Sequence, residues 1–304
     1  MKYSFLILFY LSTYLNAQQC LGGELRTVDS YTYGRFEIRM KPAIGDGNVS
    51  SFFSYHDFWG TSYDGSWQTY INEIDIEFTG NLDSSIQFTT HHPGPWSLTE
   101  IYDLNFNPHL EYHEYAFEWT PEYVKWFVDG IEVYSQNQDI IGDLIHPHKI
   151  MMNLWSAIYE DWVGEWNPNT MPVSSFYDYV KYYQYTLNEG NYGTDNNFTL
   201  LWEDDFNEMN TERWEEATHG FDGNYCQFDP VNVLFHNGEM ILFLTQTDYL
   251  LGDVNADNIL NVLDVVDIVS MVLSFTTPVN TADYNQDNML NVLDLIFIIE
   301  DIIN

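Results

Sequence analysis

Three carboxylates alternate with two isoleucines in the segment Glu73-Ile74-Asp75-Ile76-Glu77. Because a β-strand sends successive side chains to opposite faces, the three acids share one face and the isoleucines point into an apolar core. Three like charges on one strand face are costly, since none of them neutralises its neighbours. The segment is therefore a functional site, or else a solvated polar strand face or a calcium site.

Two carboxyl groups on one strand face fit the needs of a retaining glycosidase. Such an enzyme uses one carboxylate as nucleophile and one carboxylic acid as proton donor, with the two groups about 5–5.5 Å apart. The Cα atoms of Glu73 and Glu77 would be about 13 Å apart along a strand, so their side chains would have to lean toward each other. Asp75 between them would keep one glutamate protonated through like-charge repulsion and hydrogen bonding.

The chain of 304 residues carries 46 acidic and 9 basic side chains, a net charge of −37. This balance argues against nucleic acid or an anionic membrane as a partner and favours a neutral polymer or a cation. The 23 Tyr, 20 Phe and 10 Trp residues exceed what a core of this size requires. Aromatic faces are the usual platform for sugar rings, although any single ring is commonly a core residue.

Residues 1–17 have the pattern of a secretory signal peptide. Lys2 gives the positive start, residues 5–15 are apolar, and Ala17 is a small residue at the cleavage position. The segment is too short to span a membrane, and no later run is long enough. We expect a secreted, soluble monomer in which the two cysteines, Cys20 and Cys226, form a disulfide.

Residues 18–246 are a series of short alternating runs separated by turn residues. Asp129-Gly130 is a hairpin signal between two such runs. Many short strands without a long helix predict an all-β domain, a two-sheet antiparallel β-sandwich. The polar, turn-rich stretch 188–197 is expected to be a loop. Examples of the alternating runs are 33–40, 86–90, 123–128 and 240–244.

After Gly252 the pattern changes. Residues 252–257 and 282–287 begin two copies of one unit, and each copy continues through Leu-Asn-Val-Leu-Asp into an apolar helical run. An internal repeat of this kind marks a second domain, a small α-helical calcium-loop domain at residues 252–304.

Several motifs follow one another in the first domain: Tyr-Gly-Arg-Phe-Glu at 33–37, Asn-Glu-Ile-Asp-Ile-Glu-Phe at 72–78, Lys-Ile-Met-Met-Asn-Leu-Trp at 149–155 and Asp-Trp-Val-Gly at 161–164. In these motifs the chain resembles the family-16 glycoside hydrolases, specifically the bacterial licheninases, which are 1,3-1,4-β-glucanases. The resemblance covers about residues 20–246 and implies a concanavalin-like jelly roll.

The order of the blocks differs from the usual one. Licheninases open with a strand that resembles residues 200–206 and continue to the equivalent of Leu244. Here that block follows the strand 179–185, which normally ends the domain. The chain therefore resembles a circularly permuted licheninase with its junction near 188–197, and the resemblance implies that the disulfide joins the two blocks.

The resemblance also assigns roles in the cleft. It implies that Glu73 is the nucleophile, Glu77 the general acid/base and Asp75 their electrostatic partner. Many laminarinases carry one more residue between the Asp and the second Glu, and its absence here favours mixed-linkage glucan over pure β-1,3 glucan. The implied substrate-binding residues are Glu24, Arg26, Phe53, Tyr55, Gln87, Asn153, Trp155 and Trp162, and the implied ligands of a structural calcium ion in the sandwich are Asp178 and Gly238.

The C-terminal repeats resemble dockerin modules, in which each repeat holds one Ca²⁺. Oxygen ligands at positions 1, 3, 5, 9 and 12 of a loop are typical of such a site. Asn258 and Asn288 hold position 6, where Gly is usual, and Asn tolerates the left-handed turn that this position requires. The implied ligands are Asp253, Asn255, Asp257, Asn261 and Asp264 in the first loop and Asp283, Asn285, Asp287, Asn291 and Asp294 in the second.

The helical run after each loop is apolar on more than one face, and a module of about 50 residues cannot bury both faces alone. This favours a cohesin-like or scaffold protein as a partner of 252–304. The alternative is a purely structural calcium module. Val262-Leu263 and Val292-Leu293 replace the small hydroxyl pair of clostridial dockerins, which argues against a familiar cohesin.

The whole pattern predicts a secreted, endo-acting, retaining β-glucanase that cuts mixed-linkage 1,3-1,4-β-glucan without a catalytic cofactor. The alternatives are an endo-1,3-β-glucanase and a non-catalytic glucan-binding module. A binding module has no reason to keep three mutually repelling carboxylates, so the triplet favours the enzyme. None of the cleft residues lies in 252–304, and we expect that segment to be dispensable for hydrolysis of soluble glucan.

Overall fold

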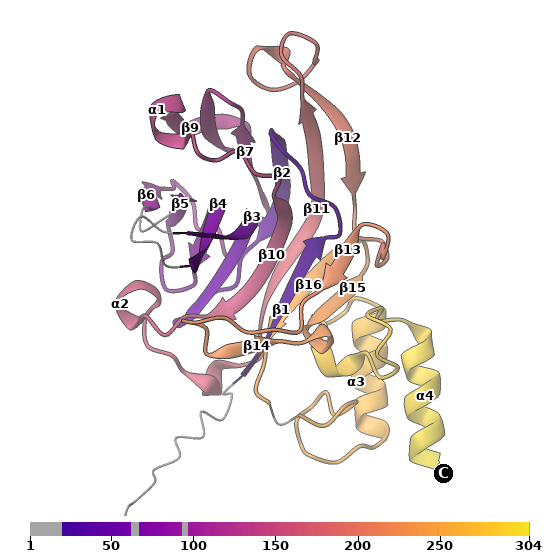
Figure 1. Ribbon diagram of the computed structural model, residues 1–304. Coiled ribbons are helices and arrows are strands. Elements are labelled where there is room, and N and C mark those ends of the chain that lie inside the picture. Colours follow the sequence, from indigo (N-terminus) through magenta and orange to yellow (C-terminus); the bar gives the residue numbers. More distant parts are fainter. Residues whose placement is uncertain (1–19, 62–66, 93–96, 248, 304) are drawn as a thin grey trace, which may run out of the picture.

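The computed structural model describes residues 20–61, 67–92, 97–247 and 249–303 (Figure 1). The predicted signal peptide, residues 1–17, lies outside the described residues. The strands are β1 Cys20–Thr27, β2 Gly34–Lys41, β3 Asn48–Thr61, β4 Trp67–Thr79, β5 Ser85–His91, β6 Ser97–Asp103, β7 His113–Trp119, β8 Tyr123–Val128, β9 Ile131–Asn137, β10 Lys149–Ser156, β11 Val173–Tyr185, β12 Phe198–Asp204, β13 Trp214–Glu216, β14 Cys226–Phe228, β15 Val233–His236 and β16 Glu239–Leu244. The helices are α1 Gln138–Ile141, α2 Glu160–Val163, α3 Val262–Val272 and α4 Val292–Ile303, with short 3₁₀ turns at Pro168–Thr170, Thr194–Asn196, Pro230–Asn232 and Asn280–Ala282.

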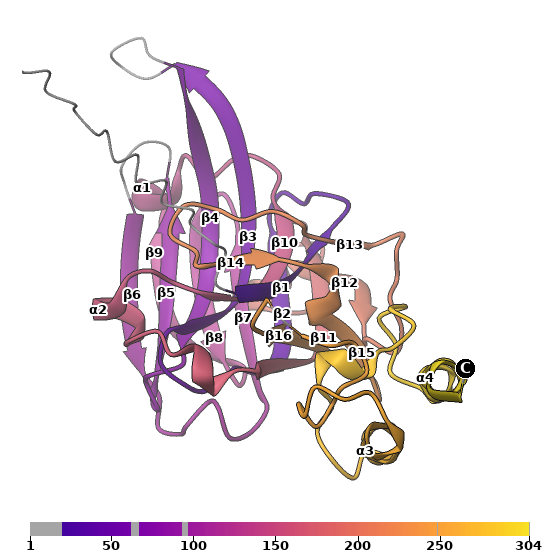
Figure 2. The same cartoon turned by 90° about the horizontal axis from the view of Figure 1, so that it is seen from below.

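The strands form two sheets that pack face to face (Figures 1 and 2). Within the described residues the first sheet has the order β13-β1-β10-β3-β4-β5-β6, with β14 on β1. The second has the order β15-β16-β11-β2-β7-β8-β9, with β12 on β11. All pairs are antiparallel except β1 and β14, so the predicted antiparallel β-sandwich is confirmed.

The core lies between the sheets and fixes strand β4. Ile74 and Ile76 are fully buried on its inner face, together with large aromatic side chains of the second sheet. One of these, Trp126, donates its indole N–H to the backbone carbonyl of Asp75 at 3.0 Å. The inner face of β4 is thus anchored by packing and by a hydrogen bond from the opposite sheet, which leaves its acidic face directed outward.

Local turn chemistry agrees with the sequence-based prediction. Asp129 and Gly130 join β8 to β9 with φ angles of 47° and 75°, as a two-residue hairpin of the primed type requires. All four runs that were expected to be strands lie in β2, β5, β8 and β16.

The two ends of the sandwich lie side by side. Leu21 and Thr245 exchange backbone hydrogen bonds of 2.8 and 2.9 Å. Cys20 and Cys226 form the predicted disulfide, with their Cα atoms 4.5 Å apart and 206 positions apart in the chain. β1 is therefore joined to the end of the domain by the bridge at Thr245, and covalently to β14 by the disulfide.

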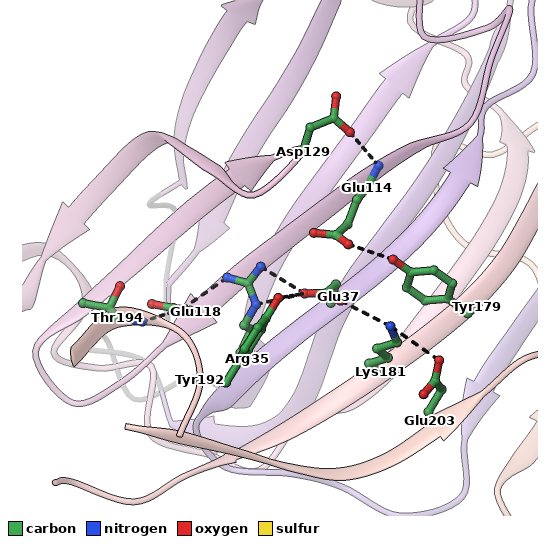
Figure 3. Close-up of polar contacts among 10 residues, drawn as sticks. All are labelled: Arg35, Glu37, Glu114, Glu118, Asp129, Tyr179, Lys181, Tyr192, Thr194 and Glu203. Atoms are coloured by element: carbon green, nitrogen blue, oxygen red, sulfur yellow. Dashed lines mark hydrogen bonds and ion pairs between the residues drawn. The ribbon is translucent and has the colours of Figure 1, made fainter. Parts of the chain in front are cut away.

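The stretch 188–197 is a loop, as expected; most of its residues are exposed, and hydrogen bonds tie it to the sandwich. Figure 3 shows the Arg35 guanidinium between the carboxylates of Glu37 and Glu118, all three buried. From the loop, the Thr194 N–H donates to Glu118 at 3.0 Å and the Tyr192 hydroxyl donates to Glu37 at 3.4 Å. Removing one partner of a buried ion pair typically costs about 3–5 kcal/mol, and the loop adds two further hydrogen bonds to the carboxylates of this network.

The C-terminal domain packs against the sandwich, which the sequence did not predict. Leu234 of β15 and Ile241 and Phe243 of β16 face away from the sandwich core and are buried by the helical domain. Figures 1 and 2 both show α3 and α4 beside this edge of the second sheet. The helical side chains that bury them are Ile268, Met271, Ala282, Leu290 and Ile298.

The physical reason is visible in β16. Residues 240–244 are apolar at every position, so this strand needs a cover on both of its faces. The sandwich core covers one face and the helical domain covers the other. Among the described residues, no helix combines the length and hydropathy that a membrane span would need.

We expect reduction of the Cys20–Cys226 disulfide to lower the free energy of unfolding by up to about 5 kcal/mol, because the bond closes a loop of 206 residues and restricts the unfolded chain. Urea unfolding with and without reductant, followed by tryptophan fluorescence, measures this loss. Two thiols titrated in the denatured, unreduced protein would show that the bond does not form.

Candidate active site

An open cleft of about 930 Å³ runs across the outer face of the first sheet. Its floor is made by side chains of the adjacent strands β1, β10, β3, β4 and β5. Helix α2 with the preceding Tyr159, and the segment 219–222, form its wall. All the predicted catalytic and substrate-binding residues line it, namely Glu24, Arg26, Phe53, Tyr55, Glu73, Asp75, Glu77, Gln87, Asn153, Trp155 and Trp162.

The strand register places the triplet in the middle of the floor. Glu73 lies between Tyr55 of β3 and His91 of β5. Glu77, two pleats further along, lies between Ser51 and Gln87. The three acids therefore project from one face of β4 into the cleft, as the alternation requires.

The surroundings of the triplet raise the pKa values of its three acids. Burial, and then the neighbouring carboxylates, raise the pKa of Glu73 and of Asp75 well above their usual ranges. Burial also raises the pKa of Glu77. Glu73 and Asp75 share a hydrogen bond, which stabilises a proton between them. These shifts all favour the protonated form of the acids, which is the direction that a proton donor needs.

His91 is a site residue that the sequence reasoning missed. Its Nε2 lies 3.3 Å from an Asp75 carboxylate oxygen and 3.9 Å from one of Glu73. When protonated it lowers the pKa of Glu73, against the effect of burial. The signal was present in the sequence, because His91 alternates with Gln87 and Thr89 on the strand next to the triplet.

A chain of hydrogen bonds positions Glu77. The Gln87 side-chain amide donates to a carboxylate oxygen of Glu77 at 2.8 Å. The Trp162 indole N–H in turn donates to the Gln87 carbonyl oxygen at 3.0 Å. Trp162 therefore orients the triplet through Gln87 as well as lining the cleft.

Buried polar groups lie on the other side of the triplet. Asn153 donates to Glu24 at 3.2 Å, and both side chains are almost fully buried. One oxygen of Glu24, the Asn153 carbonyl oxygen and the Ser51 hydroxyl are buried without a hydrogen-bond partner. Burial raises the pKa of Glu24 to about 7. Unpaired groups of this kind in a cleft fit a polyhydroxylated ligand that would complete their hydrogen bonds.

The aromatic residues differ in how much of each ring faces the cleft. Trp155 is 8% exposed and Phe53 is 7% exposed, so each presents an edge rather than a free face. Trp155 packs edge-on against Phe221, with ring centroids 4.9 Å apart. Trp162 and Tyr55 are only partly buried. The open aromatic surface is therefore contributed by Trp162 and Tyr55 more than by Trp155.

The segment after β12 forms part of the wall, which the sequence reasoning also missed. Glu215 of β13 accepts a hydrogen bond from Lys149 at 2.6 Å and pairs with Arg26 at 3.1 Å. No local motif marks these positions, because their place depends on β13 pairing with β1. The other wall residues that were not predicted are Tyr159, His219, Phe221 and Asp222.

The two C-terminal loops have the same internal hydrogen bonds. Asp253 accepts from the backbone N–H groups of residues 257 and 258, and Asp264 accepts from those of 254 and 261. Asp283 and Asp294 repeat this pattern. Each loop wraps around its first and last aspartates, and the type and spacing of its oxygen donors fit Ca²⁺. Among the described residues, the carboxylates of neither loop lie close enough together to form a ready metal site, so calcium binding stays a prediction.

The predicted calcium site in the sandwich has a competing cation. Asp178 is ion-paired with Arg39, which already neutralises its charge. Gly238 lies in the turn between β15 and β16, close to the backbone carbonyl of Asp205. A calcium ion here would have to displace a guanidinium, and this site stays a prediction.

Comparison with known proteins identifies a family and several relatives that this chain resembles. The family model "Glycosyl hydrolases family 16" matches residues 10–180. A β-glucanase from Fibrobacter succinogenes is 35% identical over 240 residues, which cover 78% of this chain and 67% of the relative. A β-glucanase from Brevibacillus brevis is 41% identical over 169 residues, which cover 55% of this chain and 62% of the relative. The solved Bacillus licheniformis β-glucanase is 38% identical, covers 52% of this chain and 70% of its own, and superposes with a TM-score of 0.45.

We expect Glu24→Gln to stabilise the protein above pH 7. The folded-state pKa of Glu24, about 7, exceeds the value of 4.5 for a free side chain. Its contribution to stability is therefore complete below pH 4.5 and lost as the pH rises through 7. The gain in the variant has an upper limit of about 3 kcal/mol, since one pKa unit corresponds to about 1.4 kcal/mol.

Urea unfolding of both proteins between pH 4 and 8 tests this expectation. Glu215→Gln is the control, because the Lys149 hydrogen bond lowers the pKa of Glu215 and its removal should act in the opposite direction. Parallel stability curves for wild type and Glu24→Gln would contradict the assignment.

Proposed function

Because the chain belongs to glycosyl hydrolase family 16, we propose that it is a secreted, endo-acting β-glucanase that hydrolyses mixed-linkage 1,3-1,4-β-glucan with retention of configuration. The observation that carries the proposal is the triplet of carboxylates at the centre of an open cleft. A cleft that spans five neighbouring strands has room for more than one sugar ring of a polysaccharide chain, which is in line with internal cleavage.

The resemblance of the triplet to that of the licheninases supports the role proposed for each acid. Glu73 attacks the anomeric carbon and forms a glycosyl ester, while Glu77 gives its proton to the departing glycosidic oxygen. Glu77 then takes a proton from water, the water oxygen attacks the anomeric carbon, and Glu73 leaves as a carboxylate. The Trp162–Gln87 chain holds Glu77 in place for both steps.

Asp75 and His91 balance the charge of the nucleophile. Glu73 must be ionised to attack, although burial favours its protonated form. A protonated His91 opposes this effect, and Asp75 can take the shared proton when Glu73 ionises. The proton within the triplet can thus move away from Glu73 without leaving the site.

The substrate proposal rests on the relatives and on the strand itself. Both curated relatives described above are named β-glucanases. The strand β4 runs through the triplet without a register shift against β3 or β5, in line with the mixed-linkage preference inferred from the sequence. The runner-up is an endo-1,3-β-glucanase, and a non-catalytic glucan-binding module is the third candidate.

Product analysis after incubation with lichenan, laminarin and carboxymethyl-cellulose separates the three candidates. We expect short mixed-linkage oligosaccharides from lichenan and little product from the other two. Faster release from laminarin would favour the runner-up, and no product from any polymer would favour the binding module. Proton NMR of the first products should show the β-anomer.

We further infer that the catalytic domain is circularly permuted. The sandwich ends at Leu21 and Thr245 are hydrogen-bonded neighbours, which is the geometry that permutation requires. Residues 198–244 supply five strands that complete both sheets. The match to the Brevibacillus relative, over 169 residues, is about as long as the first block of the domain. The match to the Fibrobacter relative, over 240 residues, is too long to lie within that block alone. Moving 198–246 in front of residue 20 should yield a chain that folds and hydrolyses the same substrate, and failure of that chain to fold would count against the inference.

The C-terminal domain is proposed as a calcium-binding module with a protein partner. After it docks on the sandwich, α3 and α4 still expose apolar side chains at equivalent positions, including Val262, Leu263 and Val266 in α3 and Val292, Leu293 and Ile296 in α4. Such a duplicated apolar surface fits a cohesin-like module. Binding to purified cohesin modules, with Val266→Asp/Ile296→Asp as the control, tests the proposal, and no binding would leave a structural role.

We expect Glu73→Gln to abolish glycosyl-enzyme formation and to lower activity at least about 10³-fold, because the change removes the nucleophile and keeps its shape. Glu77→Gln should spare aryl glycosides with good leaving groups far more than natural glucan, since acid assistance matters for poor leaving groups. Steady-state kinetics on both substrate classes measure the difference. An equal loss of activity for both variants on both substrate classes would contradict the assignment of Glu73 as nucleophile and Glu77 as acid/base.

We expect the full chain to bind two Ca²⁺ ions, one in each C-terminal loop. Isothermal titration calorimetry gives the stoichiometry, and Asp253→Asn/Asp264→Asn and Asp283→Asn/Asp294→Asn should each remove one site because a neutral amide is a weaker ligand. A wild-type stoichiometry of zero would overturn the calcium proposal.

A further inference from the structure

The second C-terminal loop reaches into the sandwich through one side chain. Asn288, at position 6 of that loop, donates its amide to Glu216 at 2.8 Å and to the backbone carbonyl of Val233 at 2.7 Å. The carbonyl of Pro230 lies 3.2 Å from the same nitrogen. One amide group thus contacts β13, β15 and the turn between β14 and β15.

The backbone next to Asn288 continues the contact. The N–H of Phe235 in β15 donates to the Asn288 carbonyl at 2.7 Å, and the N–H of Leu290 donates back to Phe235 at 3.3 Å. These bonds form a short parallel bridge between β15 and the loop. The loop therefore adds one isolated bridge to β15, at the edge of the second sheet.

The first loop provides an internal comparison. Asn258 holds the same position 6, with a φ of 63° against 66° for Asn288. Asn258 is exposed, whereas Asn288 is partly buried against the sandwich. Two equivalent side chains thus differ mainly in that only Asn288 lies at the domain contact.

The strand that Asn288 contacts carries a cleft residue. β13 has only three residues and lies at the edge of the first sheet. Glu216 contacts Asn288, and its neighbour Glu215 pairs with Arg26 and Lys149 in the cleft. β13 is anchored at its first residue, because Trp214 is buried in the core and donates its indole N–H to Asp204 at 2.9 Å. The bond from Asn288 therefore supports the other end of the strand, at Glu216.

We propose that Asn288 is a positioning residue, through which the ordered second calcium loop holds strand β13 and thereby the Arg26 side of the cleft. The proposal deepens the calcium part of the proposed function and rests on it. When the loop binds Ca²⁺, its aspartates are drawn together and Asn288 is held against Glu216. Without the ion, repulsion among Asp283, Asp287 and Asp294 loosens the loop, and β13 loses this support.

Glycine substitutions in the full chain test the proposal. Asn288→Gly removes the amide and keeps a residue that tolerates the left-handed backbone, and Asn258→Gly is the matched control in the first loop. Hydrogen exchange of the peptide that contains residues 214–216 is measured for each protein with Ca²⁺ and with chelator. Calorimetry reports the number of bound ions, and kinetics on soluble β-glucan report KM and kcat.

We expect Ca²⁺ to slow exchange at residues 214–216 in the wild type and in Asn258→Gly. In Asn288→Gly we expect exchange there to be about tenfold faster and to respond little to Ca²⁺, with two ions still bound. KM should rise in Asn288→Gly while kcat stays near the wild-type value, because Arg26 is proposed to bind substrate, whereas the three acids proposed to carry the reaction lie on β4.

Equal exchange at residues 214–216 in the two glycine variants would overturn the proposal. If the wild type binds no Ca²⁺, the calcium linkage fails, and the difference between the variants in chelator still decides whether Asn288 supports β13. If the wild type hydrolyses no glucan, the proposed activity fails while the exchange result stands.

Discussion

The structure depends on holding three carboxylates together against their repulsion. The sheet does this with its inner face: Ile74 and Ile76 are fixed in the core, and Trp126 of the opposite sheet bonds the backbone at Asp75. The strand backbone is therefore fixed, and the three carboxylates on its outer face are held near one another. Burial raises the pKa values of all three acids, and the neighbouring carboxylates raise those of Glu73 and Asp75 further, so the site favours a bound proton beside the nucleophile.

Short-range patterns in the sequence were sufficient for much of the site. Strand alternation placed Glu73, Asp75 and Glu77 on one face without knowledge of their neighbours, and the Asp129-Gly130 turn was readable from two residues. The resemblance to a known family placed residues as distant as Glu24 and Asn153 in one cleft, where they are hydrogen-bonded to each other. These predictions succeeded because each depends on the two-residue period of a strand, on local turn chemistry or on a family pattern.

What the sequence did not predict depends on contacts between distant segments. His91 becomes important only because β5 pairs with β4 in one register, and Glu215 only because β13 pairs with β1. The docking of the helical domain was missed for the same reason, since the fully apolar run 240–244 was interpreted as a strand without asking what covers its second face. We expect residues 252–304 to be dispensable for hydrolysis of soluble glucan, but they share a buried cluster with β15 and β16, and their deletion would uncover it.

The disulfide between Cys20 and Cys226 has a consequence for the lifetime of a protein exposed to proteases. The bond encloses nearly the whole sandwich in one covalent ring, from β1 to β14. A single cut in any surface loop between these residues opens the ring but releases no fragment, because both pieces stay attached through the sulfur atoms. Two cuts are needed before part of the domain can diffuse away, so a nicked molecule can retain its assembled cleft.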